Sequence, residues 1–254
     1  MNLLVDIGNT EITIYIENEY EDFKKYKFNS YPNENITMEL QRVLKDSFFE
    51  TIIVSSVVPI MYKEVEKYLT KICNKFINFN FNEFSKCINF GDLDFKNMGA
   101  DRVVVDYASV SEYGDNLIIF DLGTAITLDV FKEKLLINGY IFPGLKLLRK
   151  SLVDGTSLLS TFHFGKLNEN NMCLDTKSQL NDGIVYGLIG AINQYIKENK
   201  KHFISDSKII ITGGGLYQLI DYVGEDKLYE LLEDEILFDN NLMYKGLSKI
   251  ARLY

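Results

Sequence analysis

Two similar stretches of sequence constrain the fold of this chain more than any other feature. In the first, apolar residues 3–5 lead into Asp6, Gly8 follows two residues later, and apolar residues then alternate from Ile12 to Ile16. This order predicts a buried strand, a tight turn and a second strand. Because glycine has no Cβ, a ligand can approach the turn closely, and Asp6 adds a carboxylate that can bind a cation. Such a turn suits a phosphate group and its metal ion.

The same order recurs near the middle of the chain. The apolar residues 117–120 lead into Asp121, then Gly123 and Thr124, and alternation follows. A single Asp-x-Gly turn favours a plain hairpin, because this tripeptide is common in tight turns. Two copies placed almost half a chain length apart predict instead a duplicated domain. We expect the two turns to face each other across a cleft and to hold one polyphosphate.

Strands alternate with helical patterns through both halves, which predicts an α/β fold class. At 254 residues the chain can bury a substantial core, as one large domain or as two lobes. The break at Gly114-Asp115 divides it into an N-terminal lobe, 1–114, and a C-terminal lobe, 115–254. Strands outside the two hairpins are expected at 23–31, 51–58, 76–79, 135–142 and 208–212, and helices at 37–48, 60–73, 103–110, 145–153, 179–197, 216–223, 227–232 and 242–253.

Charge and cysteine content narrow the class of partner and compartment. The net charge is −9, which disfavours nucleic acid and anionic membranes as partners. The three cysteines, Cys73, Cys87 and Cys173, have no metal-ligand spacing and favour a reducing compartment. No apolar run approaches the ~20 residues of a membrane span, and the N-terminus lacks a signal-peptide pattern. We therefore expect a cytoplasmic protein that does not bind membranes.

Three aspartates are candidates for the chemistry: the two turn residues, Asp6 and Asp121, and Asp101, which starts a helical pattern beside Arg102. An aspartate in a first helical turn can also serve only to stabilise the helix dipole. Neither turn contains a lysine, and the P-loop pattern Gly-x4-Gly-Lys-Ser/Thr is absent. The two turn carboxylates would repel a triphosphate: at an effective dielectric of 20, each pair of unit negative charges 4 Å apart costs about 4 kcal/mol. A bound divalent ion reverses the sign of this interaction. We therefore infer Mg²⁺ bound with ATP, and a further cation.

Other motifs admit two interpretations each. Ser55–Pro59 lies between a strand and a helix, where ligands often bind, but it also suits a simple capping loop. Gly213–Gly215 offers a flat surface for adenine or ribose, or a plain turn. Glycines along the expected helix 179–197 indicate close helix packing or a subunit contact. His163 and His202 have no partner in the sequence pattern and are interpreted as bystanders.

Taken together, these residues resemble the acetate and sugar kinase/actin superfamily. More narrowly, they are similar to the type III pantothenate kinases, and the similarity runs in order along nearly the whole chain. The motifs that carry it are Asp6–Thr10, Ser55–Pro59, Gly99–Arg102, Asp121–Thr127 and Gly139–Gly144.

The resemblance implies two ribonuclease-H-like (actin-like) lobes and a homodimeric enzyme. That enzyme would transfer the γ-phosphate of ATP to the primary hydroxyl of pantothenate, giving 4'-phosphopantothenate, the first step towards coenzyme A. Asp101 would accept the proton, and Asp121 would bind the monovalent cation, K⁺ or NH₄⁺. The implied pantothenate-binding residues are Gly99, Ala100, Asp101, Arg102 and Thr176. The implied ATP-binding residues are Asp6, Ile7, Gly8, Asn9, Thr10, Glu11, Ile12, Thr13 and Thr124.

The chain departs from the family pattern in two places that bear on binding. The family often carries a pantothenate-binding tyrosine shortly before Gly99, whereas here Phe90 or Phe95 is expected to fill its space. Glu11 adds a negative charge beside the phosphate turn and must point away, or ATP binding is weaker. Two other functions remain open: another small-alcohol or sugar kinase of the superfamily, and a nucleotide-binding regulator without catalysis.

Overall fold

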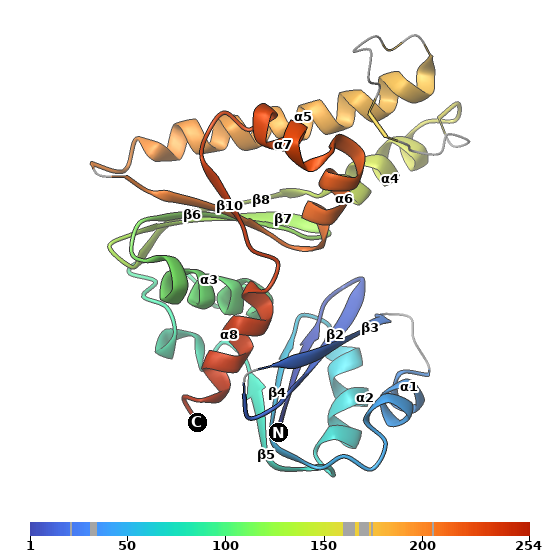
Figure 1. The fold of residues 1–254 in the computed structure, drawn as a ribbon, viewed down its shortest axis with the longest axis vertical. Helices are drawn as coiled ribbons and strands as arrows, with labels where there is room; N and C mark the ends of the chain where they lie inside the picture. Colours follow the sequence, from blue (N-terminus) through green and yellow to red (C-terminus); the bar gives the residue numbers. More distant parts are fainter. Residues whose placement is uncertain (21, 31–34, 160–165, 168–172, 174, 205) are drawn as a thin grey trace. The chain divides into compact units, whose positions relative to one another are not determined.

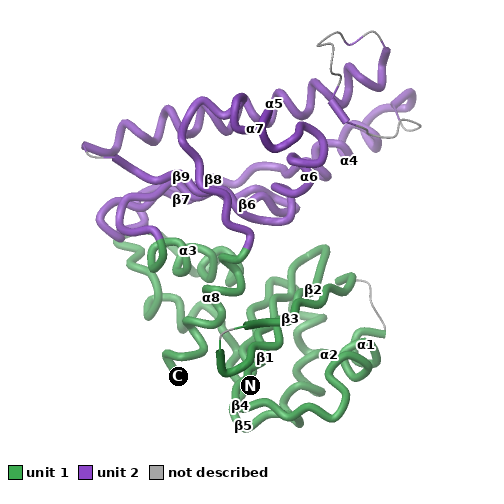
Figure 2. Tube along the Cα trace, in the orientation of Figure 1, with its two compact units in different colours: residues 1–112, 241–254 green, residues 113–240 purple. Residues whose placement is uncertain are grey.

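The computed structural model describes residues 1–20, 22–30, 35–159, 166–167, 173, 175–204 and 206–254. These residues form two compact units (Figure 2). Unit 1 contains Met1–Glu112 and Asn241–Tyr254, and unit 2 contains Tyr113–Asn240. Unit 1 therefore contains the C-terminal segment 241–254 as well as the N-terminal part of the chain.

Unit 1 is built on a five-stranded sheet of order β3-β2-β1-β4-β5 (Figure 1). The N-terminal hairpin supplies the antiparallel strands, and β4 and β5 continue the sheet parallel to β1. The strands are β1 (Asn2–Ile7), β2 (Glu11–Glu17), β3 (Phe23–Asn29), β4 (Phe49–Ser56) and β5 (Cys73–Phe79).

Helices cover both faces of this sheet, which explains why β1 is apolar and buried at consecutive positions, Leu3, Leu4 and Val5. On one face, Leu3, Val5 and Ile7 pack with the apolar residues of α1 (Ile36–Leu44) and α2 (Pro59–Leu69). On the other face, α8 (Leu242–Ala251) contacts β1 and β4, and it packs closely against α3 (Ala100–Tyr113). A short 3₁₀ turn, η1 (Phe84–Lys86), precedes α3.

Unit 2 repeats this arrangement with a sheet of order β10-β9-β6-β7-β8 (Figure 1). The antiparallel strands are β6 (Leu117–Leu122), β7 (Ala125–Lys132) and β8 (Leu135–Pro143), and the parallel ones are β9 (Lys208–Thr212) and β10 (Ile236–Phe238). The helices are α4 (Leu145–Gly155), α5 (Thr176–Lys200), α6 (Gly214–Val223) and α7 (Glu225–Leu231). Because both units carry a hairpin extended by parallel strands in the same order, the expected duplicated α/β fold is confirmed.

Several elements differ from the expected ones, and β5, β10 and α5 are three examples. Cys73 opens β5, although the sequence pattern placed it at the end of α2. Strand β10 was not expected, because its three residues are too few to show a period. Helix α5 begins at Thr176, earlier than expected, because Asp175 and Ser178 form a reciprocal capping box. Among the described residues, no helix combines the length and hydropathy needed to cross a membrane.

Candidate active site

The first phosphate turn joins β1 to β2 and has the expected geometry. Ile7 pairs with Ile12 at the end of the hairpin, and residues 8–10 connect β1 to β2. The Gly8 N–H donates a hydrogen bond to the Glu11 carbonyl at 3.0 Å, which closes the loop. Asp6 is the second-last residue of β1 and stays partly exposed. The turn therefore presents the Asp6 carboxylate beside a loop that has a glycine at its start.

Hydroxyl side chains flank Asp6 on both neighbouring strands. Thr13 of β2 and Ser55 of β4 are each in register with Asp6. Residues in register on adjacent strands point to the same face, so the three side chains form one row across the sheet. Thr13 and Ser55 are both buried. Ser55, from the motif 55–59, thus lies beside the phosphate turn, which sequence spacing alone did not reveal.

The second turn has a shorter loop but the same flanking row. Leu122 pairs with Ile126, and only Gly123 and Thr124 connect β6 to β7. Thr127 of β7 and Thr212 of β9 are in register with Asp121, as Thr13 and Ser55 are with Asp6. Each unit therefore places its aspartate between two hydroxyl-bearing strands, and Thr124 is exposed at the second turn.

Two glycines pack directly against the second turn. A Cβ on Gly213 would lie 2.2 Å from an Asp121 carboxylate oxygen, and Gly213 has φ +92°. A Cβ on Gly144 would lie 2.2 Å from the Gly123 carbonyl oxygen. Both positions therefore require glycine because the backbone approaches the turn closely. Gly215 is similarly close to Leu122, so close packing accounts for Gly213 and Gly215, whereas a Cβ on Gly214 would meet nothing within 4 Å.

Asp101 lies in the first turn of α3 in unit 1. One of its carboxylate oxygens accepts a hydrogen bond from the Arg102 backbone N–H at 2.8 Å. A Cβ on Gly99 would lie 2.3 Å from the same oxygen, so Gly99 lets the carboxylate fold back over the helix start. Burial raises the pKa of Asp101, although the Arg102 N–H and guanidinium act in the opposite direction. A carboxyl group with a raised pKa is a better proton acceptor than an ordinary aspartate.

Thr176 is the first residue of α5 in unit 2 and is exposed. Asp175 accepts a hydrogen bond from the Ser178 N–H at 2.8 Å, so the helix start is capped without Thr176. His163 lies outside the described residues.

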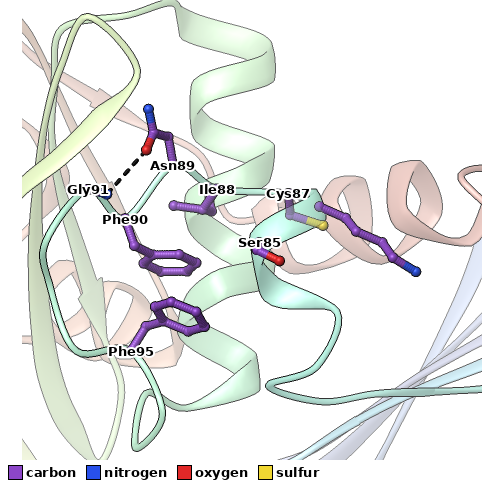
Figure 3. Close-up of a pocket in the computed structure, with 8 residues that line it drawn as sticks. Ser85, Cys87, Ile88, Asn89, Phe90, Gly91 and Phe95 are labelled. Carbon is purple, nitrogen blue, oxygen red and sulfur yellow. Dashed lines mark hydrogen bonds between the residues drawn. The ribbon is translucent and has the colours of Figure 1, made fainter.

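A pocket precedes Gly99 in the chain, where the family tyrosine was expected to be replaced (Figure 3). Its volume is about 410 Å³, and residues 85–91 with Phe95 line it. Phe90 and Phe95 stack with ring centroids 4.2 Å apart and an interplanar angle of 18°. Burial, together with the Glu83 charge, raises the pKa of the Cys87 thiol in this pocket to about 11. The two phenylalanines thus form a joint aromatic wall.

The side chains at the turns suit a magnesium ion that arrives with its nucleotide. In the part of the chain that the structure describes, no three or more His, Cys, Asp or Glu side chains gather into a metal-binding group. An ion at Asp6 would therefore have at most two such ligands from the described residues. Mg²⁺ is commonly bound in this way, through one or two carboxylates, several waters and the phosphates of a substrate.

Comparison with known proteins identifies the family to which this chain is similar. The model of the type III pantothenate kinase family matches residues 2–198. A type III pantothenate kinase from Thermosipho melanesiensis is 32% identical over 234 residues, which cover 91% of this chain and 94% of that relative.

Two solved structures share the fold at low sequence identity. One is described as a Baf family transcriptional activator from Campylobacter jejuni, with a TM-score of 0.59 and 19% identity over 99% of this chain and 98% of that one. The other is a ROK family glucokinase from Streptomyces griseus in complex with glucose and AMPPNP, with a TM-score of 0.56 and 11% identity over 100% of this chain and 99% of that one. With the family match over most of its length, this chain belongs to the type III pantothenate kinase family.

Proposed function

We propose that this protein transfers the γ-phosphate of ATP to the primary hydroxyl of pantothenate. The family match carries this proposal, and the Asp101 geometry supports it, because a partly buried carboxylate beside an arginine suits an acceptor that has both a hydroxyl and a carboxylate. The product would be 4'-phosphopantothenate, on the route to coenzyme A.

Pantothenate would bind at the start of α3. Arg102 can grip the pantothenate carboxylate through two parallel hydrogen bonds, as guanidinium groups commonly do. Asp101 would hold the attacking hydroxyl and accept its proton. Phosphoryl transfer runs through a loose transition state, so correct positioning of the hydroxyl matters more than strong basicity. Gly99, Ala100 and Thr176 would complete the binding site.

ATP would bind at the two turns, through residues 6–13 and Thr124. The Gly8 turn would approach the phosphates closely, and Asp6 would hold Mg²⁺. Asp121 would hold K⁺ or NH₄⁺, and Thr127 and Thr212 are in register with Asp121 on the neighbouring strands. When bound, these ions would neutralise phosphate charge that the two carboxylates alone would repel.

The assembly and location follow the family expectation. We propose a cytoplasmic homodimer that uses the exposed glycines of α5, at 183, 187 and 190, as part of its contact, since a Cβ there would meet nothing within 4 Å in the single chain. We propose that the two compact units act as the two lobes of the kinase.

The direct test is a phosphorylation assay with labelled ATP, Mg²⁺ and ammonium, in which pantothenate is compared with sugars and small alcohols. Of these acceptors, we expect only pantothenate to give labelled product. Transfer to a sugar but not to pantothenate would favour the sugar kinase alternative. Binding of ATP with no product from any acceptor would favour a regulator without catalysis.

A further inference from the structure

The phosphate turn of unit 1 carries two carboxylates, Asp6 and Glu11, and no lysine between residues 6 and 13. A polyphosphate that binds there meets negative charge on a protein of net charge −9. A magnesium ion offsets part of this charge. The fold also brings basic side chains to the turn from another strand, which the sequence of the turn does not show.

Two lysines of β3 lie on the same sheet face as Asp6. Lys27 is in register with Thr13 of β2, and Thr13 is in register with Asp6 of β1. Because in-register residues share a face, Lys27, Thr13 and Asp6 form one row across three strands. Lys25 lies two residues before Lys27 and therefore points to the same face.

Contacts place the Lys27 ammonium at the turn itself. Its Nζ lies 2.6 Å from a carboxylate oxygen of Glu11, the first residue of β2 after the loop. The two side chains are 45% and 43% exposed, so water screens this ion pair and it is readily exchanged for another partner. The negative charge of Glu11, which was expected to weaken ATP binding, is therefore paired with the Lys27 ammonium.

Lys25 adds a second positive charge close by. Its Nζ lies 5.4 Å from the centre of the Tyr15 ring. Burial lowers the pKa of Lys25, the Lys27 charge lowers it further, and the carboxylates of Glu11 and Asp6 oppose this shift. The Lys25 and Lys27 ammonium groups repel each other, and the carboxylates of Glu11 and Asp6 lie near them. A polyanion bound at this site would relieve the repulsion between the two lysines.

We propose that Lys27 binds the polyphosphate of ATP directly, exchanging its Glu11 partner for phosphate oxygens, with the Lys25 charge in support. This inference rests on the proposed ATP site at residues 6–13. A phosphate oxygen competes well with Glu11 because it offers more negative charge and equally strong charge-assisted hydrogen bonds. In this arrangement Glu11 acts as a competitor that occupies Lys27 when no nucleotide is bound.

Binding of MgATP to the full chain, measured by isothermal titration calorimetry, tests the proposal. We expect Lys27→Met to raise the Kd for MgATP by about 10- to 100-fold, the effect of losing one charge-assisted hydrogen bond. Lys27→Arg should restore most of the affinity. Glu11→Gln should lower the Kd several-fold, and this gain should shrink when Lys27→Met is also present.

Lys24→Met is the matched control, because Lys24 lies on the same strand but its side chain points to the opposite face. It removes the same charge and should leave the Kd unchanged. Equal Kd values for wild type and Lys27→Met, or equal losses for Lys24→Met and Lys27→Met, would overturn the proposal. If wild type binds no MgATP at all, the proposed function fails too. If wild type binds MgATP but yields no pantothenate product, only the proposed function fails.

Discussion

The Tyr244 hydroxyl of α8 donates a hydrogen bond of 3.0 Å to the Glu17 carboxylate of β2, across 227 residues of sequence. Ser248 of the same helix donates to the same carboxylate oxygen, and the Asn2 side-chain amide donates to the other oxygen at 3.0 Å. Glu17 is buried, with only 2% of its surface exposed. One buried carboxylate thus fastens the C-terminal helix to the N-terminal hairpin, which explains why the last segment of the chain belongs to unit 1.

Removing this carboxylate should destabilise unit 1. We expect Glu17→Ala to lower the free energy of unfolding by about 2–3 kcal/mol, because the Tyr244 and Ser248 hydroxyls lose a shared charged acceptor. Urea unfolding, followed by circular dichroism, measures this. Glu19→Gln is the control, since Glu19 is exposed in the loop that follows β2. Equal unfolding midpoints for both variants would contradict the anchoring role of Glu17.

Ser55 and Ser56 should respond in opposite ways to removal of their hydroxyl groups. Over the described chain, the buried Ser55 Oγ has no hydrogen-bond partner. The Ser56 Oγ accepts a hydrogen bond from the Val58 N–H at 3.1 Å and so holds the loop before α2. We expect Ser55→Ala to be neutral or stabilising, and Ser56→Ala to cost about 1 kcal/mol. Thermal unfolding of the two variants gives the comparison, and a larger loss for Ser55→Ala would contradict it.

The glycine that touches Asp121 should tolerate no side chain. Gly213→Ala would place a Cβ 2.2 Å from the Asp121 carboxylate, at a φ of +92° that alanine rarely adopts. We expect a loss of at least about 1–2 kcal/mol in unfolding free energy. Gly214→Ala is the matched control, because a Cβ there meets nothing within 4 Å and alanine favours the helix start. Similar stability of the two variants would show that the backbone at Gly213 can move away.

Much of the fold is readable from the sequence because its signals are local. Each hairpin is encoded by an apolar run, an Asp-x-Gly turn and alternation within fewer than twenty residues, and both formed where expected. The rows that flank Asp6 and Asp121 are not readable in this way. Ser55 and Thr212 reach them through parallel pairing between strands far apart in sequence, and tertiary packing sets that register.

The sequence also does not predict which sheet the C-terminal helix packs against. The periodicity of residues 242–253 predicts a helix with one apolar face, but a helix pattern does not name the sheet it covers. The long-range partners of Glu17, together with the contacts of α8 with β1 and β4, assign α8 to unit 1. The ion pair between Lys27 and Glu11 is likewise absent from any local pattern, since the strands β2 and β3 must first pair.

A requirement for K⁺ or NH₄⁺ follows from the role proposed for Asp121. We expect pantothenate phosphorylation to rise with K⁺ or NH₄⁺ in the presence of saturating Mg²⁺, and to stay low with Na⁺ alone. Asp121→Asn removes the anionic ligand and should abolish the activation while the fold is kept, as judged by circular dichroism. Initial rates over a series of cation concentrations measure this, and equal rates with Na⁺ and K⁺ would remove the proposed role.

Asp101 should govern both the rate and the pH profile. We expect Asp101→Asn to lose at least about 100-fold in kcat, because proton acceptance by a positioned base commonly contributes this much, while MgATP binding is kept. Burial raises the pKa of Asp101, so the wild-type kcat/KM should fall as the pH drops through a value above the ordinary aspartate range.

The same raised pKa has a consequence for stability with a definite sign. A carboxyl group whose folded pKa exceeds its unfolded pKa contributes most below the unfolded value, and that contribution is lost as the pH rises through the folded value. Ionised Asp101 therefore costs stability at neutral pH, and Asp101→Asn should match or exceed the wild-type unfolding free energy there. The difference in unfolding free energy between Asp101→Asn and wild type should become smaller as the pH is lowered. An Asp101→Asn variant that is inactive and also clearly less stable at neutral pH would indicate a structural role for Asp101 instead of a catalytic one.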